Sequence, residues 1–125
     1  MKGSKGFSLL ELLVVIAILG IIAAIALPRY FEAVDDAKKN AHRANIAIIQ
    51  TSLEYYRNKT GSYPADAAAF NAFLQDTTYF AERPRCPYND KYYTVDNNIT
   101  PDENNPHILN YTKTGNSYSL DYYKP

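Results

Sequence analysis

The 125-residue chain contains no tryptophan and a single cysteine, Cys86. One cysteine excludes a disulfide within the chain and any metal site built from paired cysteines. We expect Cys86 to be a packed or half-exposed thiol, with an intersubunit disulfide as the alternative. Basic and acidic residues balance at 13 each, so no basic excess indicates a nucleic-acid partner. These properties allow one modest domain.

Charge is also scarce in one long stretch near the N-terminus. A short basic leader, residues 1–6, precedes an apolar run from Phe7 to Leu27 whose only charged residue is Glu11. As a helix rising about 1.5 Å per residue, the run would be roughly 31 Å long, which is about the thickness of a bilayer's hydrocarbon core. We therefore expect a membrane-spanning helix. An uncleaved signal anchor and a cleaved secretory signal are the alternatives.

The pattern predicts one very long helix from Phe7 to about Lys59. Gly20 and Pro28 are its weak points, and we expect a kink between them because proline removes a backbone donor and clashes with the preceding turn. Beyond the proline, apolar residues repeat at three- and four-residue spacing, which predicts a stripe packed on a globular core. This predicted stripe comprises Val34, Ala37, Ala41, Ala44 and Ile48, with Ile49, Leu53 and Tyr56 extending it.

The pattern in the rest of the chain predicts a small domain with both helical and strand segments. Gly61 is the natural end of the long helix, and residues 65–75 fit a short second helix that begins near Asp66. Strand-like stretches follow at 91–95, 107–113 and 117–123, and Thr114-Gly115-Asn116 predicts a hairpin between the last two. The tyrosines at alternating positions are expected to pack in this sheet.

We therefore predict an α+β fold, in which a long N-terminal helix packs on a small antiparallel sheet with one short extra helix. The expected divisions are a leader at 1–6, a membrane-spanning helix at 7–28, and a globular head at 29–125 that includes the second half of the long helix.

Glu11 is the residue in the apolar run that calls for an explanation. A carboxylate in a membrane span costs roughly 2.5–3.5 kcal/mol at the centre and less near an end. No Lys, Arg or His lies between Phe7 and Leu27 to pair with it. The nearest cation would be a new α-amine on Phe7, one helical turn away, if the chain were cut after Gly6. That pair could form within one chain or between adjacent chains offset along a helix bundle.

The stretch KGFSLLELLVVIAILGIIAAIALP resembles the N-terminal signature of type IV prepilins and type II secretion pseudopilins. The resemblance implies that a prepilin peptidase cuts between Gly6 and Phe7 and that Phe7 becomes N-methylated. It also implies that Glu11 neutralises the N-terminal amine of a neighbouring subunit during assembly, and that Pro28 is the family's helix-kinking proline. The stretch from Tyr56 to Pro64 further resembles the Y-x₄-G-x-Y-P segment found in major secretion pseudopilins and many small pilins.

This resemblance implies that the precursor is first a single-pass protein of the bacterial inner membrane. An assembly platform driven by a separate ATPase then lifts it into a homo-oligomeric helical filament, at the cell surface or across the periplasm. We expect a structural subunit of a type IV pilus. The alternatives are a pseudopilin of a type II secretion or competence (DNA-uptake) system and, from another class, a single-span membrane-anchored binding domain.

Neither an enzyme nor a cofactor is expected. His42 and His107 have no adjacent nucleophile, phosphate-binding loop or metal-ligand spacing in the sequence. Secretion pseudopilins often hold calcium in a loop beside the sheet, and the oxygen-rich loop here contains Asp96, Asp102 and Glu103, which suit calcium in ligand type. The loop lacks EF-hand spacing, so a solvated loop is the first expectation and a calcium site the second.

Overall fold

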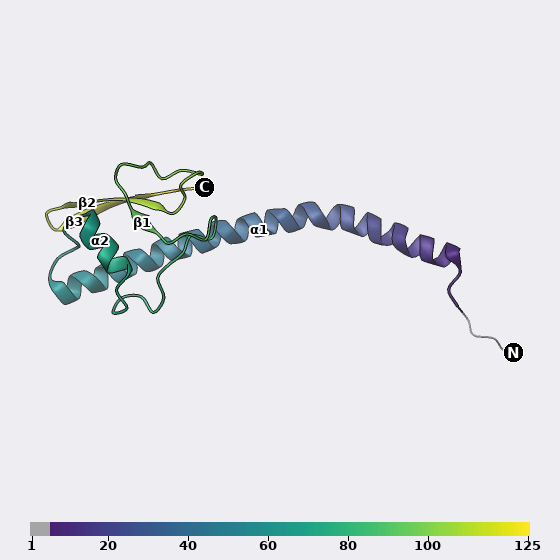
Figure 1. Ribbon diagram of the computed structural model, residues 1–125, viewed down its shortest axis with the longest axis horizontal. Helices are drawn as coiled ribbons and strands as arrows, with labels where there is room; N and C mark the ends of the chain where they lie inside the picture. The colour runs from purple at the N-terminus through teal and green to yellow at the C-terminus, as the bar shows by residue number, and fades with distance from the viewer. Residues whose placement is uncertain (1–5) are drawn as a thin grey trace. The chain divides into compact units, whose positions relative to one another are not determined.

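A computed structural model describes residues 6–125 (Figure 1). Two helices precede three strands, which confirms the α+β class. The elements are α1 (Leu9–Thr60), α2 (Ala67–Leu74), β1 (Thr94–Val95), β2 (Ile108–Thr114) and β3 (Ser117–Tyr122). The chain divides into two compact units, Met1–Ala37 and Lys38–Pro125.

The long helix α1 passes through Gly20 and Pro28 without interruption and ends within one residue of the predicted position. The expected kink at these two residues stays a prediction. Gly61 follows the last turn with φ +92°, a conformation that glycine adopts without steric cost. Its N–H donates to the carbonyl of Arg57 at 2.7 Å, which satisfies one of the orphan acceptors of the helix end. The predicted C-terminal cap is confirmed.

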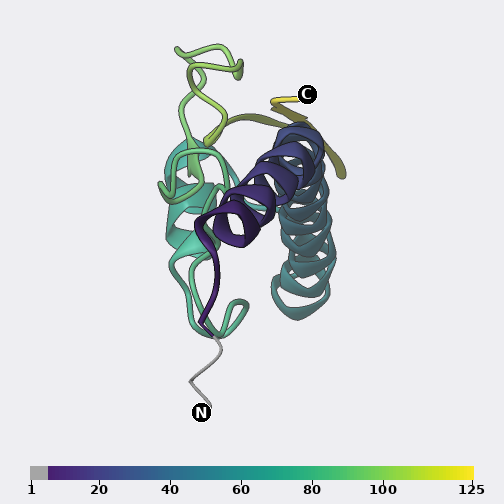
Figure 2. The same cartoon turned by 90° about the vertical axis from the view of Figure 1, so that its right-hand side faces the viewer.

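The short helix α2 starts where an aspartate can cap it. Asp66 has extended backbone, and its Oδ1 accepts the N–H of Ala69 at 2.8 Å. The helix buries Phe70, Phe73 and Leu74. Its position agrees with the predicted helix, and it is shorter by two residues at the start and one at the end. Figure 2 shows α2 beside the C-terminal half of α1.

The sheet has the order β1-β2-β3 and is mixed, which corrects the expected antiparallel sheet. Strands β2 and β3 form the predicted hairpin, turning at Gly115, whose φ is +57°. Strand β1 instead runs parallel to β2, because the loop after Val95 carries the chain back before β2 begins. This strand has two residues rather than five, since Tyr92 makes a separate antiparallel bridge to Arg85.

Two asparagine side chains complete the hydrogen bonding of this short strand pair by acting as peptide mimics. Asn71 on α2 accepts the N–H of Val95 at 2.8 Å and donates to its carbonyl at 3.0 Å. Asn97, just beyond β1, makes the same two bonds to the backbone of Tyr111, at 2.8 and 2.9 Å. Buried backbone groups need such partners, so these amides stand in for a longer strand.

One hydrophobic core joins α2, the sheet and the second half of α1. Its most enclosed aromatic residue on the sheet, Tyr111, donates its hydroxyl to the carbonyl of Pro64 at 2.6 Å, so the tyrosine-packing prediction is confirmed there. The free thiol of Cys86 is buried, as expected for a packed cysteine. The core comprises Ile46, Ile49, Leu53, Tyr63, Phe70, Phe73, Leu74, Phe80, Cys86, Tyr93, Val95, Leu109 and Tyr111.

The predicted core-facing stripe of α1 was wrong for its alanines and for Ile48. Ala37, Ala41 and Ala44 are exposed, and Ile48 keeps 52% of its surface in water. The helix instead buries the face that carries Ile49, Leu53 and others. Burying one large aliphatic side chain contributes about 1.5–3 kcal/mol, more than an alanine methyl can. Two apolar faces were present, and the face with larger side chains packs on the core.

Candidate assembly site at the start of the long helix

The N-terminus of α1 is closed by a reciprocal pair of hydrogen bonds between Ser8 and Glu11. The N–H of Glu11 donates to Ser8 Oγ at 3.2 Å, and the N–H of Ser8 donates to Glu11 Oε2 at 3.3 Å. This is the arrangement of a capping box, in which a serine and a glutamate three residues later each bond the other's backbone.

The capping box explains how a carboxylate fits at this end of an apolar helix. The first turn of any helix leaves N–H groups without partners, and these groups carry partial positive charge. Inside a bilayer no water is present to pair with them. The carboxylate of Glu11 accepts one such donor and lies where the helix dipole favours negative charge. Glu11 therefore has a structural task within its own chain, in addition to any task between chains.

Sequence reasoning missed this task although the signal was present. Ser8 and Glu11 have the S-x-x-E spacing directly before an apolar run, which is the pattern that marks a helix start. The sequence interpretation considered only the charge of Glu11, its cost in a membrane and its pairing with a Phe7 amine, and not its capacity to cap the helix. The role expected for it between subunits stays a prediction.

The expected processing site, Gly6–Phe7, lies just outside the helix. Both residues are exposed, and the side chain of Phe7 retains 87% of its surface. A Cβ added to Gly6 would meet no atom within 4 Å. The fold therefore sets no steric requirement for glycine there, and a requirement would have to come from a protease. Residues 1–5 of the expected leader lie outside the described residues.

Phe7 and Glu11 line one shallow, open hollow of about 410 Å³ together with Leu10, Val14 and Val15. Their placement on a common side of the helix start is compatible with pairing between a Phe7 amine and the Glu11 carboxylate. The structure thus brings together the two residues that the sequence predicted for assembly.

Beyond this hollow, the first half of α1 exposes apolar side chains all round. The helix is long and apolar enough to cross a membrane, and none of its most apolar 18-residue window is buried. A helix that is apolar on every side needs lipid or protein around it. The exposed large side chains are Phe7, Leu9, Leu10, Leu12, Leu13, Val14, Val15, Ile16, Ile18, Leu19, Ile21, Ile22, Ile25 and Leu27.

His42 is held inside the head by two hydrogen bonds. Its Nε2 donates to the carbonyl of Tyr123 at 2.7 Å, because a carbonyl oxygen only accepts, and its Nδ1 lies 2.7 Å from the hydroxyl of Tyr93. Burial lowers the pKa of His42, partly offset by the bond to Tyr123. With both ring nitrogens engaged, His42 serves as a structural element of the head.

His107 is also in a structural contact. Its Nδ1 lies 3.0 Å from Nδ2 of Asn89, which donates to it. Burial, followed by the charge of Lys91, lowers the pKa of His107. The two histidines therefore sit in separate contacts within the head.

The residues considered for calcium do not form a ligand cluster. Oδ1 of Asp96 accepts the N–H of Asn98, and Oδ1 of Asp102 accepts the N–H groups of Asn104 and Asn105. Among residues 6–125, no group of three or more His, Cys, Asp or Glu side chains is placed to hold a metal. Asp96, Asp102 and Glu103 thus suit calcium in ligand type alone, and the idea of a calcium site stays untested.

Comparison with known proteins finds two families along the chain. The family described as the prokaryotic N-terminal methylation motif matches residues 1–27. The family described as type II secretion system (T2SS), protein G, matches residues 29–123. No solved structure matches significantly.

Individual relatives include both secretion and fimbrial proteins. The type II secretion system core protein G of Pseudomonas aeruginosa is 33% identical over 77 residues, 62% of this chain and 54% of that protein. Fimbrial protein EcpC of Eikenella corrodens is 52% identical over 68 residues, 52% of this chain and 42% of that protein. The type IV major alpha-pilin of Moraxella bovis is 41% identical over 54 residues, 43% of this chain and 34% of that protein. The chain thus spans about half or less of these three relatives' lengths.

The protein G family covers nearly all of the chain after Pro28, and the methylation motif covers the apolar run before it. The capping box, the exposed apolar helix and the α+β head therefore belong to a protein with a pilin-like fold, and this chain is a member of the type II secretion system protein G family.

Proposed function

We propose that this chain is the structural subunit of a type IV pilus filament and polymerises through the first half of α1. The observation that carries the proposal is the helix from Leu9 to Leu27, whose large apolar side chains are exposed on every side. Before assembly, lipid would surround these side chains in the inner membrane. In the filament, the same segment of neighbouring copies would surround them.

The processing step follows from the methylation motif. A prepilin peptidase would cut between Gly6 and Phe7, both of which lie ahead of the helix and are exposed. The new amine on Phe7, methylated, would then lie near the negative Glu11. In the low dielectric of a filament core, an ion pair between neighbouring copies attracts strongly, and an unpaired charge is costly.

Assembly would use partners that resemble those of other pilins, an inner-membrane platform and a separate ATPase. No catalytic role is proposed for this chain, because the features that it carries are those of a structural subunit.

The test is mass spectrometry of the mature chain together with electron microscopy of the cell surface. We expect a chain that begins with N-methylated Phe7 and filaments that disappear when the gene is deleted. An unprocessed, unmethylated chain would contradict the proposal and support the single-span anchored binding domain.

A second candidate is a pseudopilin of a type II secretion or competence system, a shorter fibre that spans the periplasm. The observation in its favour is the match of the head, residues 29–123, to protein G. The two candidates share processing and packing and differ in the fibre made. Loss of protein secretion or DNA uptake on deletion, without surface filaments in the parent, would favour the second.

A further inference from the structure

One arginine of the head has a charge that its own chain does not pair. Within residues 6–125, the guanidinium of Arg83 makes no hydrogen bond or ion pair with another residue, although its Nε is buried. Its contact is with a ring, since its guanidinium carbon lies 4.4 Å from the ring centroid of Tyr92. A guanidinium stays charged and has several N–H donors. Arg83 therefore has donors available for a ligand.

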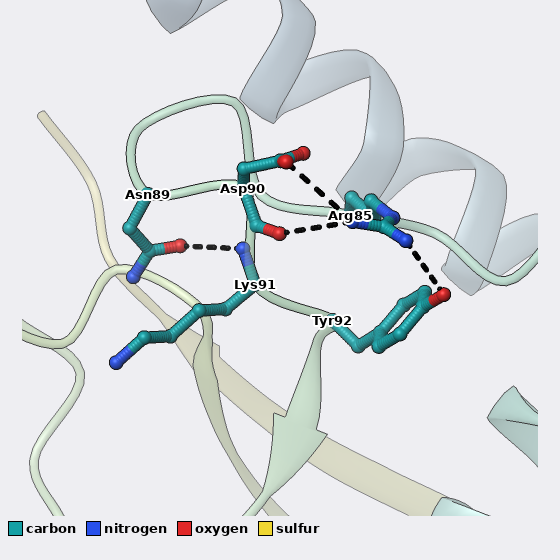
Figure 3. Close-up of polar contacts among 5 residues, drawn as sticks. All are labelled: Arg85, Asn89, Asp90, Lys91 and Tyr92. Carbon is teal, nitrogen blue, oxygen red and sulfur yellow. Dashed lines mark hydrogen bonds and ion pairs between the residues drawn. The ribbon is translucent and has the colours of Figure 1, made fainter.

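The neighbouring Arg85 is already paired and provides a comparison within the same loop. Its Nη1 lies 3.5 Å from the carboxylate of Asp90, and its Nη2 donates to the hydroxyl of Tyr92 at 2.7 Å (Figure 3). Its guanidinium carbon lies 4.3 Å from the centroid of the same tyrosine ring that Arg83 contacts. Two positive charges at one ring repel each other, and of the two only Arg85 has an ion pair in the described part of the chain. An added negative group would therefore be favoured beside Arg83.

Both arginines line an open hollow of about 310 Å³, which we call the arginine hollow. Its apolar lining includes Phe80, which belongs to the buried core, and Ile48 on α1, which keeps 52% of its surface in water. Sites for small molecules typically measure about 300–1,000 Å³. The hollow therefore has room for a small ligand. Its lining residues are Asn45, Ile48, Phe80, Glu82, Arg83, Pro84 and Arg85.

The helix side and the loop side of the hollow are held together before any ligand binds. Asn45 on α1 donates from Nδ2 to the carbonyl of Arg85 at 2.9 Å. The carbonyl of Pro84 accepts the N–H of Tyr93 at 3.2 Å, which closes the loop on itself. Such preorganisation lowers the entropy cost of binding.

The charges at the hollow favour a ligand with a single negative group. A carboxylate fits the planar fork of the Arg83 guanidinium through two parallel hydrogen bonds. Glu82 also lines the hollow, and its charge repels a ligand that carries a second negative group. Ile48, Phe80 and Pro84 favour an apolar body next to the carboxylate. The chemistry of the lining thus matches a small monocarboxylate with an aliphatic or aromatic body.

We propose that the arginine hollow is a binding site for such a monocarboxylate, with the carboxylate on Arg83 and the apolar body against Ile48 and Phe80. The ligand touches both α1 and the loop that follows Phe80, so its binding stabilises the folded head. The inference goes beyond the proposed function, because the site is complete within one chain and its test needs no filament.

The first experiment titrates the purified full-length chain in detergent with three small molecules. Hexanoate has a carboxylate and an apolar body, hexanamide has the same body without the charge, and acetate has the charge with little of the body. Binding is followed by NMR through the Nε–H signal of Arg83. The Nε–H of Arg57 is the internal reference, because its guanidinium carbon also lies over a tyrosine ring, 5.2 Å from the centroid of Tyr63.

We expect hexanoate to saturate the Arg83 signal with a Kd below about 10 mM and to bind at least about tenfold more tightly than hexanamide or acetate. The Arg57 signal should not move. Equal affinity for hexanamide, or an Arg83 signal that does not saturate with hexanoate, would overturn the inference.

The second experiment compares substitutions, with the methyl signals of Ile48 as the common reporter. Arg83→Gln and Arg57→Gln each remove one guanidinium that lies over a tyrosine ring, but only the first lines the hollow. We expect Arg83→Gln to bind hexanoate at least about tenfold more weakly and Arg57→Gln to bind it as the parent does. Glu82→Gln removes the repelling charge and should bind hexanoate more tightly.

Parental affinity for hexanoate in a folded Arg83→Gln chain would overturn the proposed site. If that variant does not fold, the comparison of hexanoate with hexanamide in the parent chain decides the question alone.

Discussion

The backbone N–H of Ser8 lies 3.3 Å from the carboxylate of Glu11, and the hydroxyl of Ser8 accepts from the N–H of Glu11 in return. Glu11 therefore has two separable properties. Its oxygen caps the helix, and under the proposed function its charge would pair with an amine on another chain. An amide in the same place could retain the first property without the second, which makes the two roles open to experiment.

Glu11→Gln is expected to keep the capping box, because a glutamine oxygen also accepts from the N–H of Ser8. It removes the charge that would pair with the Phe7 amine of a neighbour. We expect a chain that is inserted and processed normally but forms few filaments, as counted by electron microscopy and by shearing assays. Glu11→Val loses both properties and should assemble no better than Glu11→Gln.

The control for this comparison is Glu11→Asp, which keeps the charge on a shorter side chain. Abundant normal filaments from Glu11→Gln would show that capping, and not an ion pair, is what assembly needs.

Replacing Gly6 by leucine should block removal of the leader. The structure sets no steric limit at this position, so we expect a folded, membrane-inserted chain that retains residues 1–6. Intact-mass spectrometry measures the difference directly. Gly20→Ala serves as the matched glycine substitution and should be processed normally, and a correctly shortened Gly6→Leu chain would contradict the assigned cut.

The head should lose stability as the pH falls below about 6.5. Burial holds the pKa of His42 in the folded chain below 6.5, its ordinary value. The unfolded chain therefore binds more protons between these two pKa values, and stability declines as the pH falls through that window and is constant above it. Thermal unfolding of the full chain in detergent, followed between pH 8 and pH 5, measures this dependence.

Substitution of His42 tests whether this residue is the source of the pH dependence. His42→Asn leaves the buried Tyr93 hydroxyl or the Tyr123 carbonyl without its partner, which costs about 1–3 kcal/mol at every pH. We expect a lower melting temperature at pH 8 and a flatter pH dependence. His107→Asn is the matched control and should change the slope less, since His107 is more exposed. An unchanged slope in His42→Asn would exclude this histidine as the source.

Chelation of calcium should leave the melting temperature unchanged. The carboxylates of Asp96 and Asp102 already accept backbone N–H groups of their own loop, and the described residues form no cluster of metal-binding side chains. Differential scanning fluorimetry with EDTA, and again with added calcium, tests this expectation. A rise with calcium that is lost in Asp102→Asn would instead establish a site in this loop.

Much of the fold could be predicted because its signals are local. The length of α1, its end at Gly61, the cap at Asp66 and the hairpin at Gly115 each depend on residues a few positions apart. The parallel pairing of β1 could not be predicted, since it depends on Asn71 and Asn97 satisfying backbone groups 24 and 14 residues away.

The choice of buried face on α1 failed for a related reason. Ile48 and Ile49 are neighbours in sequence and point about 100° apart, so periodicity supports either face. Only the shape of the rest of the head selects Ile49. At the helix start, the local pattern from Ser8 to Glu11 is sufficient to predict the capping box, but only the charge of Glu11 was interpreted.

The hydrogen bond from His42 to Tyr123 spans 81 residues of chain. The ribosome therefore synthesises His42 long before it synthesises Tyr123, whose carbonyl pairs with the imidazole. Until synthesis passes Tyr123, the growing chain carries the long apolar helix but lacks the carbonyl that pairs with His42. We expect the helix to insert before the head is complete. A chain whose synthesis stops early would have an incompletely folded head and would be exposed to degradation before it could join a filament.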